Sequence, residues 1–178
     1  KGIRAPNSGS IEVNGEILAE QIGGQIFIDS FALIFPNNPR KAADYAEASA
    51  SVSHDGDGIL GARFIAACIS SAFTPKTISA IIEDGLNEIP ETSTYAKVVR
   101  AVTEFHKKNP NDFRACRQFL EEEWGYDKYG GICHIIPNAG VCVLALLYGK
   151  GNVSRTIEIA TMCGWDTDCN AGNVGSIV

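Results

Sequence analysis

Residues 58–73 read GILGARFIAACISSAF, a run with few polar side chains. A densely apolar run of this length is typical of a helix buried in a core. Thr74 and Pro75 follow directly, and proline ends a helix because it lacks the N–H and its ring clashes with the preceding turn. No segment of the chain alternates apolar and polar residues as a half-buried strand would. The sequence therefore predicts an all-α fold.

Helical spacing extends outward from this run in both directions. On the N-terminal side, apolar residues from Leu18 to Leu33 recur at steps of three or four, which predicts one helix over residues 17–34. The Gly23-Gly24 pair inside that stretch indicates close packing against another helix. Further helices are expected at residues 39–50, 77–88, 93–108, 111–125, 138–148 and 154–162.

The composition is that of an ordinary globular domain. With 178 residues, 45% of them hydrophobic and 20% charged, the chain can bury a core and is expected to form a single domain. The net charge of −6 and the lack of a basic run argue against nucleic acid as a partner. No apolar stretch reaches the roughly 18 residues of a membrane span, so no membrane partner is expected. The chain opens at Lys1 without a methionine, which suggests that it was cut out of a longer one.

Six cysteines are scattered along the chain without a C-x-x-C pair. A disulfide framework belongs to shorter secreted chains, so reduced thiols in a cytoplasmic protein are expected. Cys68 and Cys142 lie among aliphatic residues, where a free cysteine acts as a small buried hydrophobe. The spacing leaves open a zinc site whose ligands would be Cys133, His134, Cys163 and Cys169.

Residues 163–172, CGWDTDCNAG, place two carboxylates two positions apart beside a glycine. Residues i and i+2 lie on opposite sides of a regular helix, so Asp166 and Asp168 can converge only where the chain turns. Gly164 suits such a turn. Two converging oxygen ligands are what a hard cation such as Mg²⁺ or Ca²⁺ requires. The alternative is that Asp166 or Asp168 merely caps the helix that follows.

A second polar stretch, His54 to Gly61, precedes the apolar run and contains glycines at positions 56, 58 and 61. A glycine loop that leads into a helix can present free backbone N–H groups to an anion. Asp55 and Asp57 would repel an anion unless they contact ribose hydroxyls or a metal. The alternative is a tight turn between two helices, with His54 on the surface.

Together these stretches resemble the ADP-ribosylglycohydrolase family. The resemblance rests on GWDTDCNAGNVGS and SHDGDGILGARFIAACISSAF, and it extends to NGEILAEQIGGQIFID and to Pro137-Asn138 before VCVLALLYGKGN, so it covers nearly the whole chain. It implies a compact, multi-helix orthogonal bundle that hydrolyses the bond between ADP-ribose and a protein side chain or related group. The implied partners are an ADP-ribosylated protein or a small ADP-ribose conjugate, and the implied cofactors are two Mg²⁺ (or Mn²⁺) ions.

The resemblance also implies roles for individual residues. Asp166 and Asp168 match metal ligands, and Cys169 occupies the threonine position of the family's Asp-x-Asp-Thr motif, although a thiol is a softer ligand than Mg²⁺ prefers. The matching substrate segment, which wraps the diphosphate of ADP-ribose, comprises His54, Asp55, Gly56, Asp57, Gly58 and Gly61.

One part of the family pattern has no counterpart. The N-terminal Thr-Asp-Asp cluster does not occur in residues 1–178. The chain is therefore expected to be the C-terminal two thirds of the domain, without half of the metal ligands and without an identified acid/base residue. Two alternatives stay open: a non-catalytic module of the same fold that binds ADP-ribose or a nucleotide, and a plain helical interaction domain.

Overall fold

A computed structural model describes residues 2–178, and within that range the fold is all-α, as the sequence predicts. The helices α6 and α10 form the centre of the fold, and each is longer than the helices before and after it in the chain. The helices are α1 (Ile11–Asn14), α2 (Glu16–Ala19), α3 (Gly23–Ile26), α4 (Asp29–Leu33), α5 (Pro39–Ala50), α6 (Asp57–Ser71), α7 (Ile78–Leu86), α8 (Thr94–Lys108), α9 (Phe113–Trp124), the 3₁₀ turn η1 (Tyr126–Lys128), α10 (Ile135–Gly149), α11 (Val153–Met162) and α12 (Thr167–Ile177).

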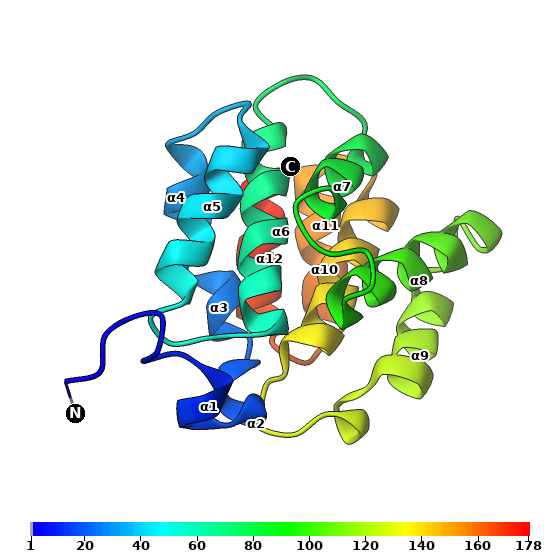
Figure 1. Cartoon of the computed structure of the whole chain (residues 1–178). Helices are drawn as coiled ribbons and strands as arrows, with labels where there is room; N and C mark the ends of the chain where they lie inside the picture. The colour runs from blue at the N-terminus through cyan, green and yellow to red at the C-terminus, as the bar shows by residue number, and fades with distance from the viewer. Residues whose placement is uncertain (1) are drawn as a thin grey trace.

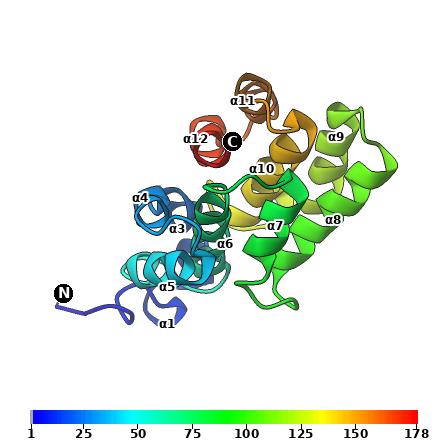
Figure 2. The same cartoon turned by 90° about the horizontal axis from the view of Figure 1, so that it is seen from above.

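The central helices are flanked on both sides (Figures 1 and 2). α5 packs along α6, while α8 and α9 pack along α10, and α11 and α12 complete that side. Every residue of α10 is buried, and so are most residues of α6, which confirms the expected core helix at residues 58–73. In Figure 1, α6, α10 and α12 all begin at the lower end of the bundle. The loops that precede these three helices therefore meet at one end of the molecule.

Buried polar side chains tie the N-terminal segment to α12. The amide of Gln25 donates to Oδ1 of Asn173 at 3.1 Å, and Tyr95 donates its hydroxyl to Oε1 of Gln25 at 2.7 Å. Asp29 accepts from Nδ2 of Asn173 at 3.0 Å and from Oγ of Ser176 at 2.7 Å. Because buried polar groups are costly unless they are paired, these bonds fix α3 and α4 against α12.

The prediction of a single helix over residues 17–34 is wrong. The structure divides residues 11–33 into the four short helices α1 to α4, and Leu18 and Phe27 are 64% and 67% exposed. The Gly23-Gly24 pair does permit close packing, because a Cβ atom at Gly24 would clash with the carbonyl group of Gly58. The helix α12, which directly follows the acidic stretch, corresponds to the helix that the capping alternative for Asp166 and Asp168 supposes.

No helix within residues 2–178 combines the length and the apolar character needed to cross a membrane. All six cysteines are free thiols, and four of them are buried.

Candidate metal centre

A sharp turn precedes α12. Gly164 and Trp165 both have positive φ angles, 75° and 60°, and a bulky residue such as Trp adopts this conformation only where the surroundings hold it. The indole ring of Trp165 stacks on Tyr126, with ring centroids 5.1 Å apart, and the guanidinium of Arg117 lies 3.8 Å from its centroid. Arg117 also donates through Nε to the carbonyl of Cys163 at 2.6 Å. The turn that the sequence predicts is therefore held from both sides.

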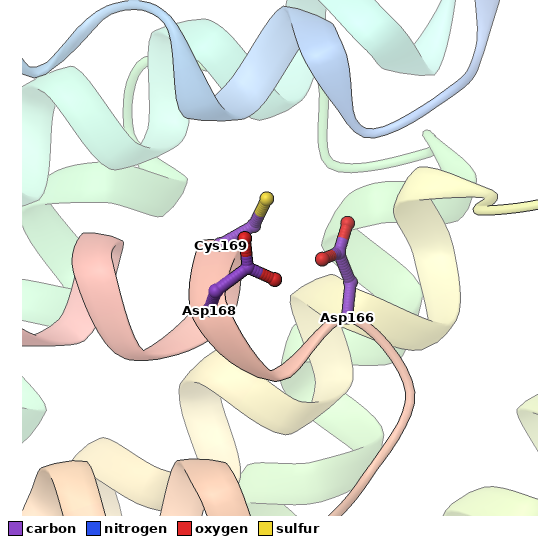
Figure 3. A group of neighbouring side chains, drawn as sticks. All are labelled: Asp166, Asp168 and Cys169. Carbon is purple, nitrogen blue, oxygen red and sulfur yellow. The ribbon is translucent and has the colours of Figure 1, made fainter.

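Beyond the turn, three donor groups converge. One ligand atom each from Asp166, Asp168 and Cys169 lies within 4.8 Å of the others, and Figure 3 shows the three side chains projecting into the same space. Asp166 occupies the N-cap position of α12, yet its side chain accepts no hydrogen bond from the helix backbone. Among residues 2–178, no lysine or arginine forms an ion pair with Asp166 or Asp168. Asp166 therefore stands at the N-cap position without capping α12 through its side chain.

A second thiol reaches the same carboxylate from another segment. Sγ of Cys133 lies 2.9 Å from Oδ2 of Asp166 and 3.3 Å from the hydroxyl of Tyr126. Burial, followed by the hydrogen bond to Asp166, raises the pKa of Cys133 to about 11. Burial and the contact with Asp166 raise the pKa of Cys169 to about 12. A hydrogen bond with Asp166 and two backbone N–H groups lower the pKa of Asp168.

The loop from His54 to Gly61 lies against α2, α3 and α10 and has little backbone left for a ligand. All N–H groups of residues 54–60 donate within the protein. The N–H groups of His54 and Asp55 donate to the carbonyl oxygens of Ala50 and Ala19. Those of Gly56 and Asp57 donate to the side chains of Asp55 and Glu20. The next three donate to backbone carbonyls inside the loop, Gly58 to that of Asp55 and both Ile59 and Leu60 to that of Gly56. The anion-binding role predicted for this loop stays a prediction, and in this conformation it would depend on side chains.

The side chains of the loop have structural contacts of their own. His54 is 8% exposed rather than on the surface, and its ring packs against Gly23 and Gly24. Burial lowers the pKa of His54. Asp55 accepts from the backbone N–H of Ile11 at 3.0 Å. Gly61 leaves room for the side chains of Ile135 and Tyr95.

Asp57 lines a cavity of about 260 Å³ with Glu16, Glu20, Lys128, Tyr129 and His134, the cavity that lies beside the segment carrying Cys133. Nε2 of His134 lies 3.5 Å from Oε2 of Glu20, and the ring of Tyr129 stacks on the imidazole at 4.5 Å. Burial raises the pKa of Asp57, and the Glu20 carboxylate adds to the rise. The neighbours Cys133 and His134 thus face different acidic groups, Asp166 on one side and Glu20 on the other.

These features fit one known family. The family model described as ADP-ribosylglycohydrolase matches residues 2–178. The chain belongs to the ADP-ribosylglycohydrolase family. No match was found among curated proteins or among solved structures. Membership supports the all-α fold and an ADP-ribosylglycohydrolase-type hydrolase in general terms.

The three converging donors fit the metal of an ADP-ribosylglycohydrolase only in part. Two adjacent carboxylates without a basic partner suit a divalent cation. The thiol of Cys169 does not suit Mg²⁺, which prefers oxygen. The zinc site considered from the sequence, with Cys133, His134, Cys163 and Cys169 as ligands, is not assembled, because His134 faces Glu20. Within residues 2–178, Asp166, Asp168 and Cys169 form the only potential metal-binding group.

Sequence reasoning missed the residues that support this site in the ADP-ribosylglycohydrolase chain. Asn138 is fully buried in α10 and bonds to Asp166, Asn170, Tyr126 and His134. An amide directly before a long apolar run was the available signal, because a buried polar group needs partners. Tyr126 gave no comparable signal in the sequence, and Cys133 was considered there only as one ligand of a zinc site.

Proposed function

We propose that this chain carries the metal site of a hydrolase that cleaves the glycosidic bond between ADP-ribose and a protein side chain or related group. The observation that supports it best is the pair Asp166 and Asp168, whose carboxylates lie together in an ADP-ribosylglycohydrolase-family chain and have no ion-pair partner within residues 2–178. The hydrogen bond between the two carboxyl groups requires a proton on one of them. A divalent cation would replace that proton and let both carboxylates ionise.

The side chains of the site either hold the cation or position a ligand in the proposed reaction. Asp166 and Asp168 hold the cation, and in the metal-free chain Cys133 donates to Oδ2 of Asp166 and orients that carboxylate. Hydrolysis at the ribose carbon develops positive charge on the sugar, which nearby carboxylates stabilise. When bound, the cation would fix the ribose hydroxyls and activate the attacking water.

We also propose a role for the loop before α6. Its backbone N–H groups are occupied, so the diphosphate contact would require a change of conformation or the use of side chains. Asp57 lines the cavity beside His134 and is the residue of this loop suited to accept a hydrogen bond from a ribose hydroxyl. Mg²⁺ and Mn²⁺ are the cations that the family resemblance implies for the site.

The test is release of ADP-ribose from protein substrates linked through arginine or serine. It would be run on this chain and on the longest product of its gene, with and without a chelator. We expect metal-dependent release that Asp166→Ala abolishes and Asp112→Ala, at another helix N-terminus, leaves in place. Undiminished release by Asp166→Ala would refute the metal assignment. Saturable ADP-ribose binding without any release would favour the non-catalytic binding module instead.

A further inference from the structure

The cysteines of this chain fall into two groups. Cys68, Cys116, Cys142 and Cys163 are buried, and each is at most 4% exposed. Cys133 and Cys169 are only partly buried. Both of these thiols lie beside one carboxylate, that of Asp166: Cys133 hydrogen-bonds to it, and Sγ of Cys169 lies within 4.8 Å of one of its oxygens. Packing alone gives no reason for the two accessible thiols to meet at the same acidic group.

The donor chemistry of this group differs from that of a magnesium site. Asp166, Asp168 and Cys169 already supply two oxygens and one sulfur within 4.8 Å of one another. Mg²⁺ demands oxygen ligands in a near-ideal octahedron, whereas Zn²⁺ accepts mixed sulfur and oxygen ligands in a tetrahedron. A thiolate beside two carboxylates therefore selects the softer cation.

Cys133 is placed to supply a fourth donor. Its Sγ lies 2.9 Å from Oδ2 of Asp166, on the segment before α10 rather than on α12. In a tetrahedral zinc site, bonds of about 2.3 Å to sulfur and about 2.1 Å to oxygen separate the two ligand atoms by about 3.6 Å. The ion would require these two atoms to separate by a fraction of an ångström. It would also require Sγ of Cys133 to move towards Asp168 and Cys169, because Cys133 lies outside the group of ligand atoms within 4.8 Å of one another. The hydroxyl of Tyr126 and the amide of Asn138 lie beside the same sulfur and limit its movement.

We propose that this site binds a thiophilic divalent cation of the Zn²⁺ class, with Asp166, Asp168 and Cys169 as ligands and Cys133 as the fourth donor. The inference shares its location with the proposed function and rests on it for the presence of a metal, but it concerns the identity of the cation. Binding forms two metal–sulfur bonds and releases the two thiol protons to the solvent, so no oxidant or reductant takes part.

The test uses Co²⁺ as a spectroscopic probe for zinc sites. The reduced 178-residue chain, freed of metal by a chelator, is titrated with Co²⁺ in the absence of oxygen and of substrate. We expect the near-ultraviolet charge-transfer absorption of cobalt–thiolate bonds, saturation at one ion per chain, and displacement by Zn²⁺ but not by a large excess of Mg²⁺.

Three variants assign the sulfur donors. Cys169→Ser should weaken Co²⁺ binding at least about tenfold. Cys133→Ser should remove about half of the charge-transfer intensity, because one of two thiolates is lost. Cys116→Ala removes a buried thiol in α9 and should bind Co²⁺ as the parent chain does. Circular dichroism checks that each variant is folded.

Two results would overturn the proposal. One is a folded parent chain that shows no thiolate absorption with Co²⁺, and the other is an absorption that Cys169→Ser leaves unchanged. The outcome is separable from that of the proposed function. Thiolate absorption without any ADP-ribose release would sustain the zinc-type site and refute the hydrolase. Mg²⁺-dependent release by a chain without thiolate absorption would do the reverse.

Discussion

Oδ1 of Asn138 accepts a hydrogen bond from the backbone N–H of Asp166, 3.3 Å away. The same oxygen accepts from Nδ2 of Asn170 at 2.8 Å. Nδ2 of Asn138 donates to the hydroxyl of Tyr126 at 2.7 Å and to the carbonyl of His134 at 2.9 Å. One buried amide on α10 therefore positions the turn before α12 and the segment that carries Cys133 at the same time.

Replacing Asn138 with Ala should loosen the metal centre without touching a ligand. The change leaves buried donors and acceptors unpaired, which costs about 1–3 kcal/mol in the free energy of unfolding. Loss of such a supporting contact should also weaken metal binding by about 10–100-fold. Urea denaturation and a Co²⁺ titration measure the two effects.

The matched control for this prediction is Val143→Ala, which removes two methyl groups from a fully buried position of the same helix. It should lower stability by a comparable amount, about 1–3 kcal/mol, and leave metal affinity unchanged. If Asn138→Ala and Val143→Ala weaken metal binding equally, Asn138 has no specific positioning role.

Asp166 and Asp112 occupy the same position at the start of a helix but should respond differently to removal. Asp112 accepts a hydrogen bond from the N–H of Ala115 at 3.0 Å, so Asp112→Ala should cost about 1 kcal/mol of stability. Asp166 makes no such bond and lies against a second carboxylate. In a chelating buffer Asp166→Ala should therefore cost less than Asp112→Ala. Urea denaturation compares them, and an equal or larger loss at Asp166 would show that its carboxylate stabilises the fold as much as a capping side chain does.

Glycines at two helix positions give a second matched pair. A Cβ atom at Gly58 would clash with the carbonyl oxygen of Ala19, whereas a Cβ atom at Gly172 would meet nothing within 4 Å. Gly58→Ala should therefore lower the free energy of unfolding by about 1–3 kcal/mol. Gly172→Ala should raise it by about 0.5–1 kcal/mol, because alanine favours a helix over glycine. Thermal unfolding of both variants checks the signs, and a neutral Gly58→Ala would show that α2 and α6 can separate cheaply.

The sequence predicts the long elements of this fold well and the short ones poorly. The run at residues 58–73 and the spacing at 93–108 correspond to α6 and α8, because many apolar residues repeat one period. The stretch at 17–34 has similar spacing but forms separate short helices. Its glycines allow α3 to approach the start of α6, and this tertiary contact outweighs the local periodicity.

Some residues of the metal centre are close together in the sequence, and others are far apart. The convergence of Asp166 and Asp168 follows from two carboxylates beside a glycine turn, a pattern contained within a few residues. Cys133 and Asn138 reach Asp166 across 33 and 28 residues of chain. No local period or spacing relates such distant positions, so only the packing of α10 against α12 shows that they meet.

We expect the free energy of unfolding to fall in mild acid because His54 binds a proton in the unfolded chain. Burial lowers its pKa from the ordinary value of 6.5, so the folded chain keeps the imidazole neutral while the unfolded chain takes up a proton. The unfolded state then binds more protons, and the contribution of His54 is complete above pH 6.5 and is lost as the pH falls below it. One proton sets a ceiling of about 1.4 kcal/mol per pH unit.

Urea denaturation of the parent chain and of His54→Gln, at about pH 7.5 and about pH 5.5, measures this contribution. The variant should lose less stability between the two pH values, because glutamine does not titrate. Ser53→Ala removes the hydroxyl that lies 2.8 Å from Nδ1 of His54 but keeps the imidazole, so its stability should still fall in acid. A parent chain and a His54→Gln variant with equal pH dependence would show that His54 can take up a proton in the folded state without loss of packing against Gly23 and Gly24.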